Sequence, residues 1–156
     1  MFDDLRDLYQ EVILDHGKSP RNFRHPDNAT CLAHGNNPVC GDTLVIYITL
    51  DDGGVITDAA FQGQGCAISV ASASMMTDIL KGKTTVEAKR LFDGFHDMCT
   101  KDDFDISRLS DCDEDAVERL VMLAGVKEFP IRVKCATLAW HTMYSAVSGE
   151  EEISTE

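Results

Sequence analysis

The first half of the chain has the pattern of a small antiparallel sheet. Residues 43–50 are rich in β-branched side chains and predict a strand. The Asp-Asp-Gly-Gly sequence at 51–54 favours a turn, and residues 55–62 follow as the second arm of a hairpin. A shorter strand is expected near residues 30–33, and Gly63 is expected to end the hairpin.

Segments with apolar residues at helical spacing precede and follow this sheet in the sequence. Thr84 and Glu87 form a capping box, and Pro130 suits the first position of a helix. The acidic, irregular stretch 101–115 is expected to be an exposed loop. The result is an α+β fold, a small antiparallel sheet packed against several helices. Helices are expected at residues 3–17, 66–82, 84–98, 115–123 and 131–147.

Length and hydropathy indicate one domain. The chain has 156 residues, 44% of them hydrophobic, enough for a core of its own. We expect a single domain over residues 1–148 and a flexible acidic tail over 149–156. No stretch approaches the ~18 apolar residues of a membrane span. The acidic start at Asp3 and Asp4 does not resemble a signal peptide, so we expect a cytoplasmic protein that does not bind a membrane.

The charge is strongly acidic, and this narrows the classes of partner. Fourteen basic against 27 acidic side chains give a formal net charge of −13. Such a surface repels phosphate backbones, which argues against nucleic-acid binding and favours a partner with a basic docking face. The chain also has six cysteines. In a cytosolic chain of this size, cysteines more often serve metal binding or catalysis than disulfides.

Three of the cysteines lie where predicted elements begin. Cys40 stands in a Pro- and Gly-flanked turn, Cys66 follows a Gly-x-Gly bend, and Cys135 lies in the first turns of the last helix. Helix N-termini favour the thiolate form. Asp42 lies two residues after Cys40, so both side chains can point to the same side of extended chain. Three thiolates and a carboxylate suit Zn²⁺.

The sequence also allows other roles for these residues. Asp42 has an alternative role as a turn-capping residue, and a histidine could replace it as the fourth ligand. Arg132, one helical turn before Cys135, could pair with Asp42, meet an incoming group or remain solvated. The other cysteines lack such settings and are taken as ordinary thiols (Cys31, Cys99 and Cys112). The histidines are scattered and adjoin none of the site cysteines (His16, His25, His34, His96 and His141).

Three motifs resemble a known family. They are Asn-Asn-Pro-Val-Cys-Gly-Asp at 36–42, Gly-Gln-Gly-Cys-Ala-Ile-Ser at 63–69 and Arg-Val-Lys-Cys-Ala-Thr-Leu-Ala-Trp at 132–140. They look like the signatures of the IscU/NifU-N-like iron–sulfur assembly proteins. The resemblance covers nearly the whole chain and implies a SufE/NifU-like fold.

Two departures distinguish branches of that family. The scaffold branch has a histidine immediately before its third cysteine, where this chain has Lys134. It also has a Leu-Pro-Pro-Val-Lys motif just ahead, where this chain has Glu-Phe-Pro-Ile at 128–131. With the acidic insert at 101–115, these features resemble the SufU branch.

The SufU resemblance implies a function, and two alternatives remain beside it. It implies a zinc-dependent sulfurtransferase that takes sulfur from a SufS-type cysteine desulfurase and passes it to a downstream iron–sulfur scaffold complex. Cys40 would accept the sulfur, and Asp42, Cys66 and Cys135 would complete the zinc site. The first alternative is a scaffold that assembles a [2Fe–2S] cluster or holds iron on the same residues. The second is a binding module with a structural zinc.

Overall fold

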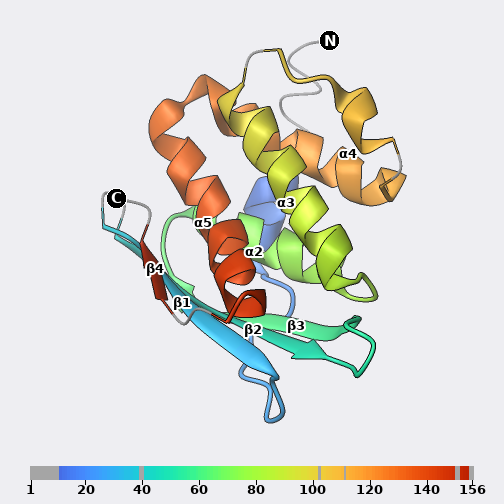
Figure 1. Ribbon diagram of the computed structural model, residues 1–156. Coiled ribbons are helices and arrows are strands. Elements are labelled where there is room, and N and C mark those ends of the chain that lie inside the picture. Colours follow the sequence, from blue (N-terminus) through green and yellow to red (C-terminus); the bar gives the residue numbers. More distant parts are fainter. Residues whose placement is uncertain (1–10, 39–40, 102, 111, 150–151, 155–156) are drawn as a thin grey trace.

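A four-stranded sheet with helices over one face forms the molecule (Figure 1). The computed structural model describes residues 11–38, 41–101, 103–110, 112–149 and 152–154. The strand order is β3-β2-β1-β4; β3, β2 and β1 pair antiparallel with one another, and β4 pairs in parallel with β1. The expected α+β class is confirmed. The strands are β1 (Cys31–Asn37), β2 (Asp42–Leu50), β3 (Ile56–Gln64) and β4 (Glu152–Ser154).

The predicted hairpin is confirmed, but its second strand is longer than expected. The Asp51 carboxylate accepts hydrogen bonds from the backbone N–H groups of Gly53 and Val55, which closes the turn. Gly63 does not end β3, because it pairs with Leu44 inside the ladder. Its φ is +144°, and a Cβ there would overlap the Thr43 carbonyl oxygen. The glycine therefore permits a close approach of the strands rather than a break.

Strand β1 is also longer than the stretch expected near residues 30–33. Its second half, Gly-Asn-Asn, has little intrinsic strand preference, but pairing with β2 along the whole strand overrides that. Burial alternates along it, with Ala33, Gly35 and Asn37 inside. A Cβ on Gly35 would overlap Thr142 Oγ1 of the last helix. The inner face of β1 therefore lies directly against that helix.

The helices follow the sequence pattern with local corrections. The capping box of Thr84 and Glu87 is present, and Pro130 occupies the first turn of α5. Residues 11–18 are helical, so Gly17 lies within that helix rather than at its end. The remaining elements are α2 (Ala67–Leu80), α3 (Thr85–Thr100), η1 (Ile106–Leu109), α4 (Glu114–Leu123), η2 (Ala124–Glu128) and α5 (Pro130–Val147).

Two segments expected to be irregular have structure. The stretch 101–115 contains the 3₁₀ helix η1, and Leu109 on it is buried in the core. It is buried because α3 carries Gly94 at that point, where a Cβ would lie 2.7 Å from Leu109 Cδ1. Residues 152–154, placed in the expected flexible tail, form β4 and pair in parallel with β1. The open edge of β1 offers backbone groups that this segment satisfies.

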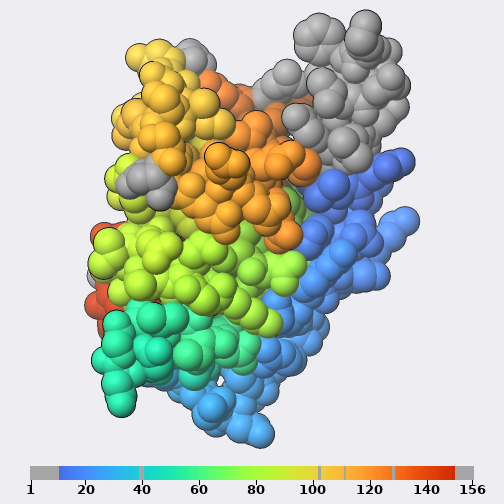
Figure 2. Space-filling view, turned by 90° about the vertical axis from the view of Figure 1, so that its right-hand side faces the viewer, coloured from blue at the N-terminus to red at the C-terminus, as the bar shows by residue number. Residues whose placement is uncertain are grey.

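The layers bring distant parts of the chain together. Helix α5 packs on β1 and β2, α2 packs on β3 and on α5, and α3 covers α5 from outside. A view from the side shows α4 in orange above α3 in yellow-green, with the tip of the hairpin in teal below (Figure 2). Trp140 on α5 is fully buried against Phe95 of α3. Among the described residues, none of the helices combines the length and apolar composition that crossing a membrane requires.

Candidate metal centre

The strand register places Asp42 at the inner edge of the sheet. Asp42 begins β2 and lies directly opposite Asn37, the last residue of β1. Residues directly opposite in an antiparallel pair share one face, and here that face is the buried one that α5 covers. Both side chains are fully buried, at 0% exposed. The Asn37 amide Nδ2 lies 3.4 Å from Asp42 Oδ2.

Cys66 reaches the same point from the start of α2. It is the N-cap residue, and its Sγ accepts a hydrogen bond from the Ser69 backbone N–H at 3.4 Å. Its own backbone N–H donates to Asp42 Oδ1 at 2.8 Å. Gly65 lies beside that carboxylate, and a Cβ there would overlap Asp42 Oδ1. The Gly-Cys sequence therefore lets the chain pass close to the carboxylate and cap a helix with a thiol.

Cys135 completes the cluster from the first turns of α5. Its side chain is fully buried, and Asn37 Nδ2 lies 3.8 Å from its Sγ. One ligand atom each from Asp42, Cys66 and Cys135 all lie within 4.8 Å of one another. The structure thus gathers three of the four sequence-predicted ligands from three elements that are far apart in the chain.

The donor set of the cluster suits a cation such as zinc. The buried Asp42 carboxylate lies next to the sulfur of the buried Cys135 and the sulfur of the partly buried Cys66, and a cation would compensate the charge of such a group. Sulfur and carboxylate oxygen are both established zinc ligands. Cys66 caps the N-terminus of α2, and Cys135 lies in the first two turns of α5. These residues could therefore hold a metal ion.

Cys40 and Arg132 were also predicted from the sequence to belong to the site. Cys40, expected as both sulfur acceptor and ligand, lies outside the described residues. Arg132 is exposed in the first turn of α5, where its backbone N–H donates to the Phe129 carbonyl at 2.7 Å. The hydrogen bonds that the structure gives the Asp42 carboxylate come from Cys66 and Asn37. A role for Arg132 at the site therefore stays a prediction.

The other cysteines lie apart from the cluster. Burial raises the pKa of the Cys99 thiol to about 12, and it raises the pKa of Cys31 as well. Both thiols therefore stay protonated at neutral pH and are poor nucleophiles. Cys112 is half-buried at the edge of a hollow between η1 and α4.

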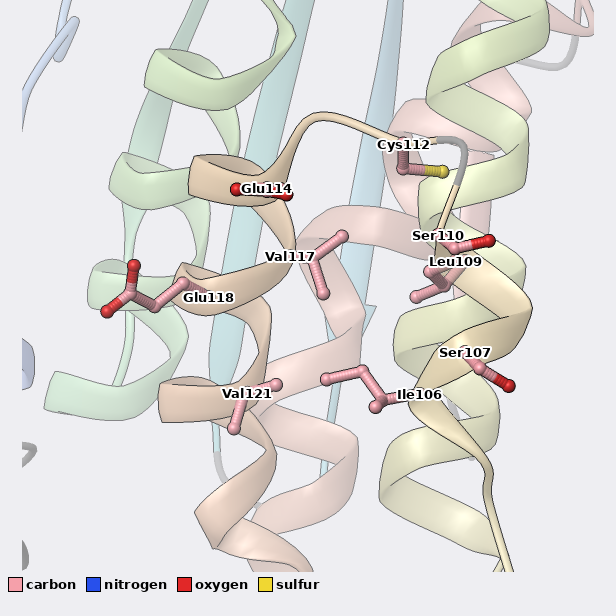
Figure 3. A pocket seen from close by; sticks show the side chains of 9 residues that line it. All are labelled: Ile106, Ser107, Leu109, Ser110, Cys112, Glu114, Val117, Glu118 and Val121. Atoms are coloured by element: carbon pink, nitrogen blue, oxygen red, sulfur yellow. The ribbon is translucent and has the colours of Figure 1, made fainter.

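That hollow is apolar and contains none of the cluster residues. In Figure 3, Val117 and Val121 of α4 point toward Ile106 on η1, whereas Glu118 points away. Its described lining is mostly apolar, whereas the potential metal ligands gather around Asp42.

The described histidines do not join the metal-ligand cluster. His16 is buried and its Nδ1 lies 2.7 Å from Ser74 Oγ. Burial lowers the pKa of His16. The rings of His141 and His96 meet edge to face, with centroids 5.5 Å apart, where α3 crosses α5. Burial, and then the charge of His96, lower the pKa of His141.

Two residues around the cluster were missed by the sequence interpretation. Asn37 stood in a quoted motif but had no role assigned to it. The alternation Ala33, Gly35, Asn37 could have placed it on the inner face, where an amide is unusual. Gly65 entered the sequence analysis only as part of the bend before Cys66, and its closeness to Asp42 emerges only from the folded structure.

Comparison with known proteins identifies the family. The family model described as "NifU-like N terminal domain" matches residues 8–136, a range that contains all three cluster residues. The chain belongs to the NifU-like N-terminal domain family. This membership agrees with the resemblance recognised from the three motifs.

Similar members of the NifU-like family carry two kinds of name. The zinc-dependent sulfurtransferase SufU of Bacillus subtilis is 40% identical over 148 residues, covering 95% of both chains. The iron–sulfur cluster assembly scaffold protein IscU of Streptococcus pyogenes serotype M1 is 38% identical, covering 92% of this chain and 84% of its own. A solved structure from Fervidobacterium islandicum AW-1, described as a scaffold protein for the SUF system (FiSufU), is 34% identical. Its TM-score is 0.77, over 88% of this chain and 94% of that one.

Proposed function

We propose that this protein is a zinc-dependent sulfur acceptor in iron–sulfur cluster assembly, with Cys40 as the sulfur-carrying thiol. The observation that carries the proposal is the meeting of Asp42, Cys66 and Cys135 within 4.8 Å. The similarity to a zinc-dependent sulfurtransferase over nearly the full length of both chains supports it. The proposed partner is a SufS-type cysteine desulfurase.

In this proposal four residues hold the zinc. Asp42, Cys66 and Cys135 are gathered by the fold, and Cys40 is added because it lies two residues before Asp42 in the sequence. When bound, zinc would keep cysteine sulfur as thiolate at neutral pH and would take no part in electron transfer. Asp42 would be the weakest of the four ligands, which suits a site that must release a cysteine for reaction.

The reacting group is the Cys40 thiolate. It attacks the outer sulfur of a persulfide on the desulfurase, in the manner of thiol–disulfide exchange. A sulfur–sulfur bond forms on Cys40 as the one on the desulfurase breaks. The desulfurase cysteine leaves as a thiolate and takes up a proton, so electrons and atoms balance without a further reductant. Asp42, Cys66 and Cys135 stay in place and keep the site assembled.

Surface charge supports a protein partner of opposite charge. The net charge of −13 favours a desulfurase with a basic docking face.

Arg132 and Lys134 are exposed in the first turn of α5, next to the buried Cys135. They are basic groups at the edge of the site on an otherwise acidic protein, and we propose that Arg132 meets the incoming persulfide. The sulfur then passes to a downstream scaffold in the cytoplasm.

A second candidate function is assembly of a [2Fe–2S] cluster on the same residues. The scaffold names of two of the relatives favour it, and cysteine ligands serve either metal. Against it stand Lys134 and the Glu-Phe-Pro-Ile sequence at 128–131, which depart from the scaffold branch.

Metal analysis separates the two candidates. Protein purified without added metal should contain zinc and have no visible absorption. A brown protein with iron and acid-labile sulfide in place of zinc would support the scaffold and refute the sulfur acceptor. Cys40→Ala should abolish the stimulation of desulfurase turnover by this protein, whereas the control Cys99→Ala, at a buried thiol outside the cluster, should retain it.

A further inference from the structure

Asn37 connects two of the proposed ligands. It ends β1 opposite Asp42 and is fully buried on the inner face of the strand. Its Nδ2 lies 3.4 Å from Asp42 Oδ2 and 3.8 Å from Cys135 Sγ. An amide nitrogen carries two hydrogens, so it can donate one to each acceptor. A single side chain therefore contacts a ligand on β2 and a ligand on α5.

The orientation of the amide follows from its neighbours. Rotating it by 180° would turn Oδ1 toward a carboxylate oxygen and a sulfur, which are both acceptors. The orientation with Nδ2 inward is therefore favoured. It leaves Oδ1 buried and without a hydrogen-bond partner among the described residues. A buried acceptor without a hydrogen-bond partner destabilises the folded state. The stability of the fold therefore does not explain why an amide occupies this position.

We propose that Asn37 is a positioning residue of the metal site, whose amide donates to Asp42 and Cys135 and fixes both toward the metal. This inference rests on the proposed zinc site. Hydrogen bonds to anionic ligands are stronger than those between neutral groups. They also spread the negative charge of the ligands and hold their orientation, as outer partners of metal ligands do elsewhere.

Zinc affinity tests the proposal, with the neighbouring asparagine as a matched control. Asn36 is exposed and lies on the opposite face of β1. Asn37→Leu keeps the branched shape of the side chain and removes the donors. It should weaken zinc binding about 10- to 100-fold, measured by competition with a chromophoric chelator. Asn36→Leu should stay within about threefold of the parent, as a surface substitution does.

A spectroscopic measurement separates positioning from a general loss of structure. In the cobalt-substituted protein, donors on the sulfur lower the energy of its lone pairs. Their loss should move the thiolate-to-cobalt charge-transfer band to longer wavelength in Asn37→Leu and leave it in place in Asn36→Leu. Asn37→Ala removes the same donors without adding volume, and it should show the same band shift and loss of affinity if the leucine variant does not fold.

The outcomes that overturn the inference differ from those that overturn the zinc site. A parent that binds zinc, with a folded Asn37 variant that binds it within threefold and with an unmoved cobalt band, refutes the role of Asn37 alone. Equal losses in the Asn36 and Asn37 variants refute it as well. A parent that binds no zinc refutes the proposed function and this inference together.

Discussion

The backbone N–H of Cys66 donates a hydrogen bond to the carboxylate of Asp42 at 2.8 Å. This bond joins the start of α2 to the start of β2, across 24 residues of chain. It uses Oδ1 of the carboxylate, while Asn37 lies beside Oδ2. Asp42 therefore has a structural role at the same time as its proposed role as a ligand, and the two can be tested separately.

Two substitutions of Asp42 should separate these roles. Asp42→Ala leaves the partly buried Cys66 N–H without an acceptor, which should lower the unfolding free energy of the zinc-free protein by about 1–3 kcal/mol. Asp42→Asn keeps an acceptor and should lower it less. Both should weaken zinc binding, because both remove the charged ligand. Chemical denaturation with a chelator present, and zinc competition in parallel, measure the two effects. Equal stability of the two variants would show that the Cys66 bond contributes nothing.

Gly65 should not tolerate a side chain. An alanine Cβ would overlap Asp42 Oδ1 and lie 3.0 Å from its Cγ, and the buried carboxylate has little room to move. Overpacking of this kind costs about 1–3 kcal/mol, and each kcal/mol corresponds to about 2–4 °C in Tm at this size. Gly125→Ala is the control, since a Cβ there meets no atom within 4 Å. Thermal unfolding measures both variants, and a Gly65→Ala protein as stable as the control would contradict the described packing.

Alkylation should divide the cysteines into three groups. Cys99 should react only on unfolding, because it is 3% exposed and its pKa is raised to about 12. Cys66 is half-buried and should react in the zinc-free protein and be protected when zinc is bound. Cys112 is also half-buried but lies outside the cluster, so its rate should not depend on zinc. Peptide mass mapping gives the rates, and a Cys66 rate unaffected by zinc would argue against its role as a ligand.

The stability of the zinc-free protein should fall as the pH drops below about 6.5. The pKa values of His16 and His141 are lowered in the folded state, chiefly by burial. Below the ordinary value of 6.5 the unfolded chain therefore binds more protons than the folded one, and acid favours unfolding. His141→Gln should flatten this dependence. Zinc must be absent, because protonation of its ligands releases it over a similar range. A slope unchanged in His141→Gln would contradict the contribution of His141.

Much of the fold could be predicted from local signals. Residues 43–62 carried a hairpin pattern with its turn, and Thr84, Glu87 and Pro130 marked helix starts that the structure confirms. Local sequence signals did not predict the structure where contacts between distant residues determine it. Strand β1 forms through pairing with β2, and β4 pairs with the edge of β1, which no local sequence pattern predicts. Leu109 is buried because Gly94 leaves space for it.

The convergence of three of the four proposed ligands could be predicted, but the residues around them could not. Cysteines near the starts of elements are a local pattern, and Asp42, Cys66 and Cys135 do converge. The contacts of Asn37 depend on the register between β1 and β2 and on the helix that covers them. No sequence spacing contains that information, because Asn37 and Cys135 are 98 residues apart.

The most direct test of the central claim is to find where sulfur arrives. The zinc-loaded protein is incubated with a SufS-type desulfurase and L-cysteine, and its peptides are then mapped by mass spectrometry without a reducing agent. We expect one added sulfur atom on the peptide that contains Cys40, none in Cys40→Ala, and none on the peptides that contain Cys99 or Cys112. Sulfur carried by one of those peptides, or no transfer to a protein that holds its zinc, would contradict this claim.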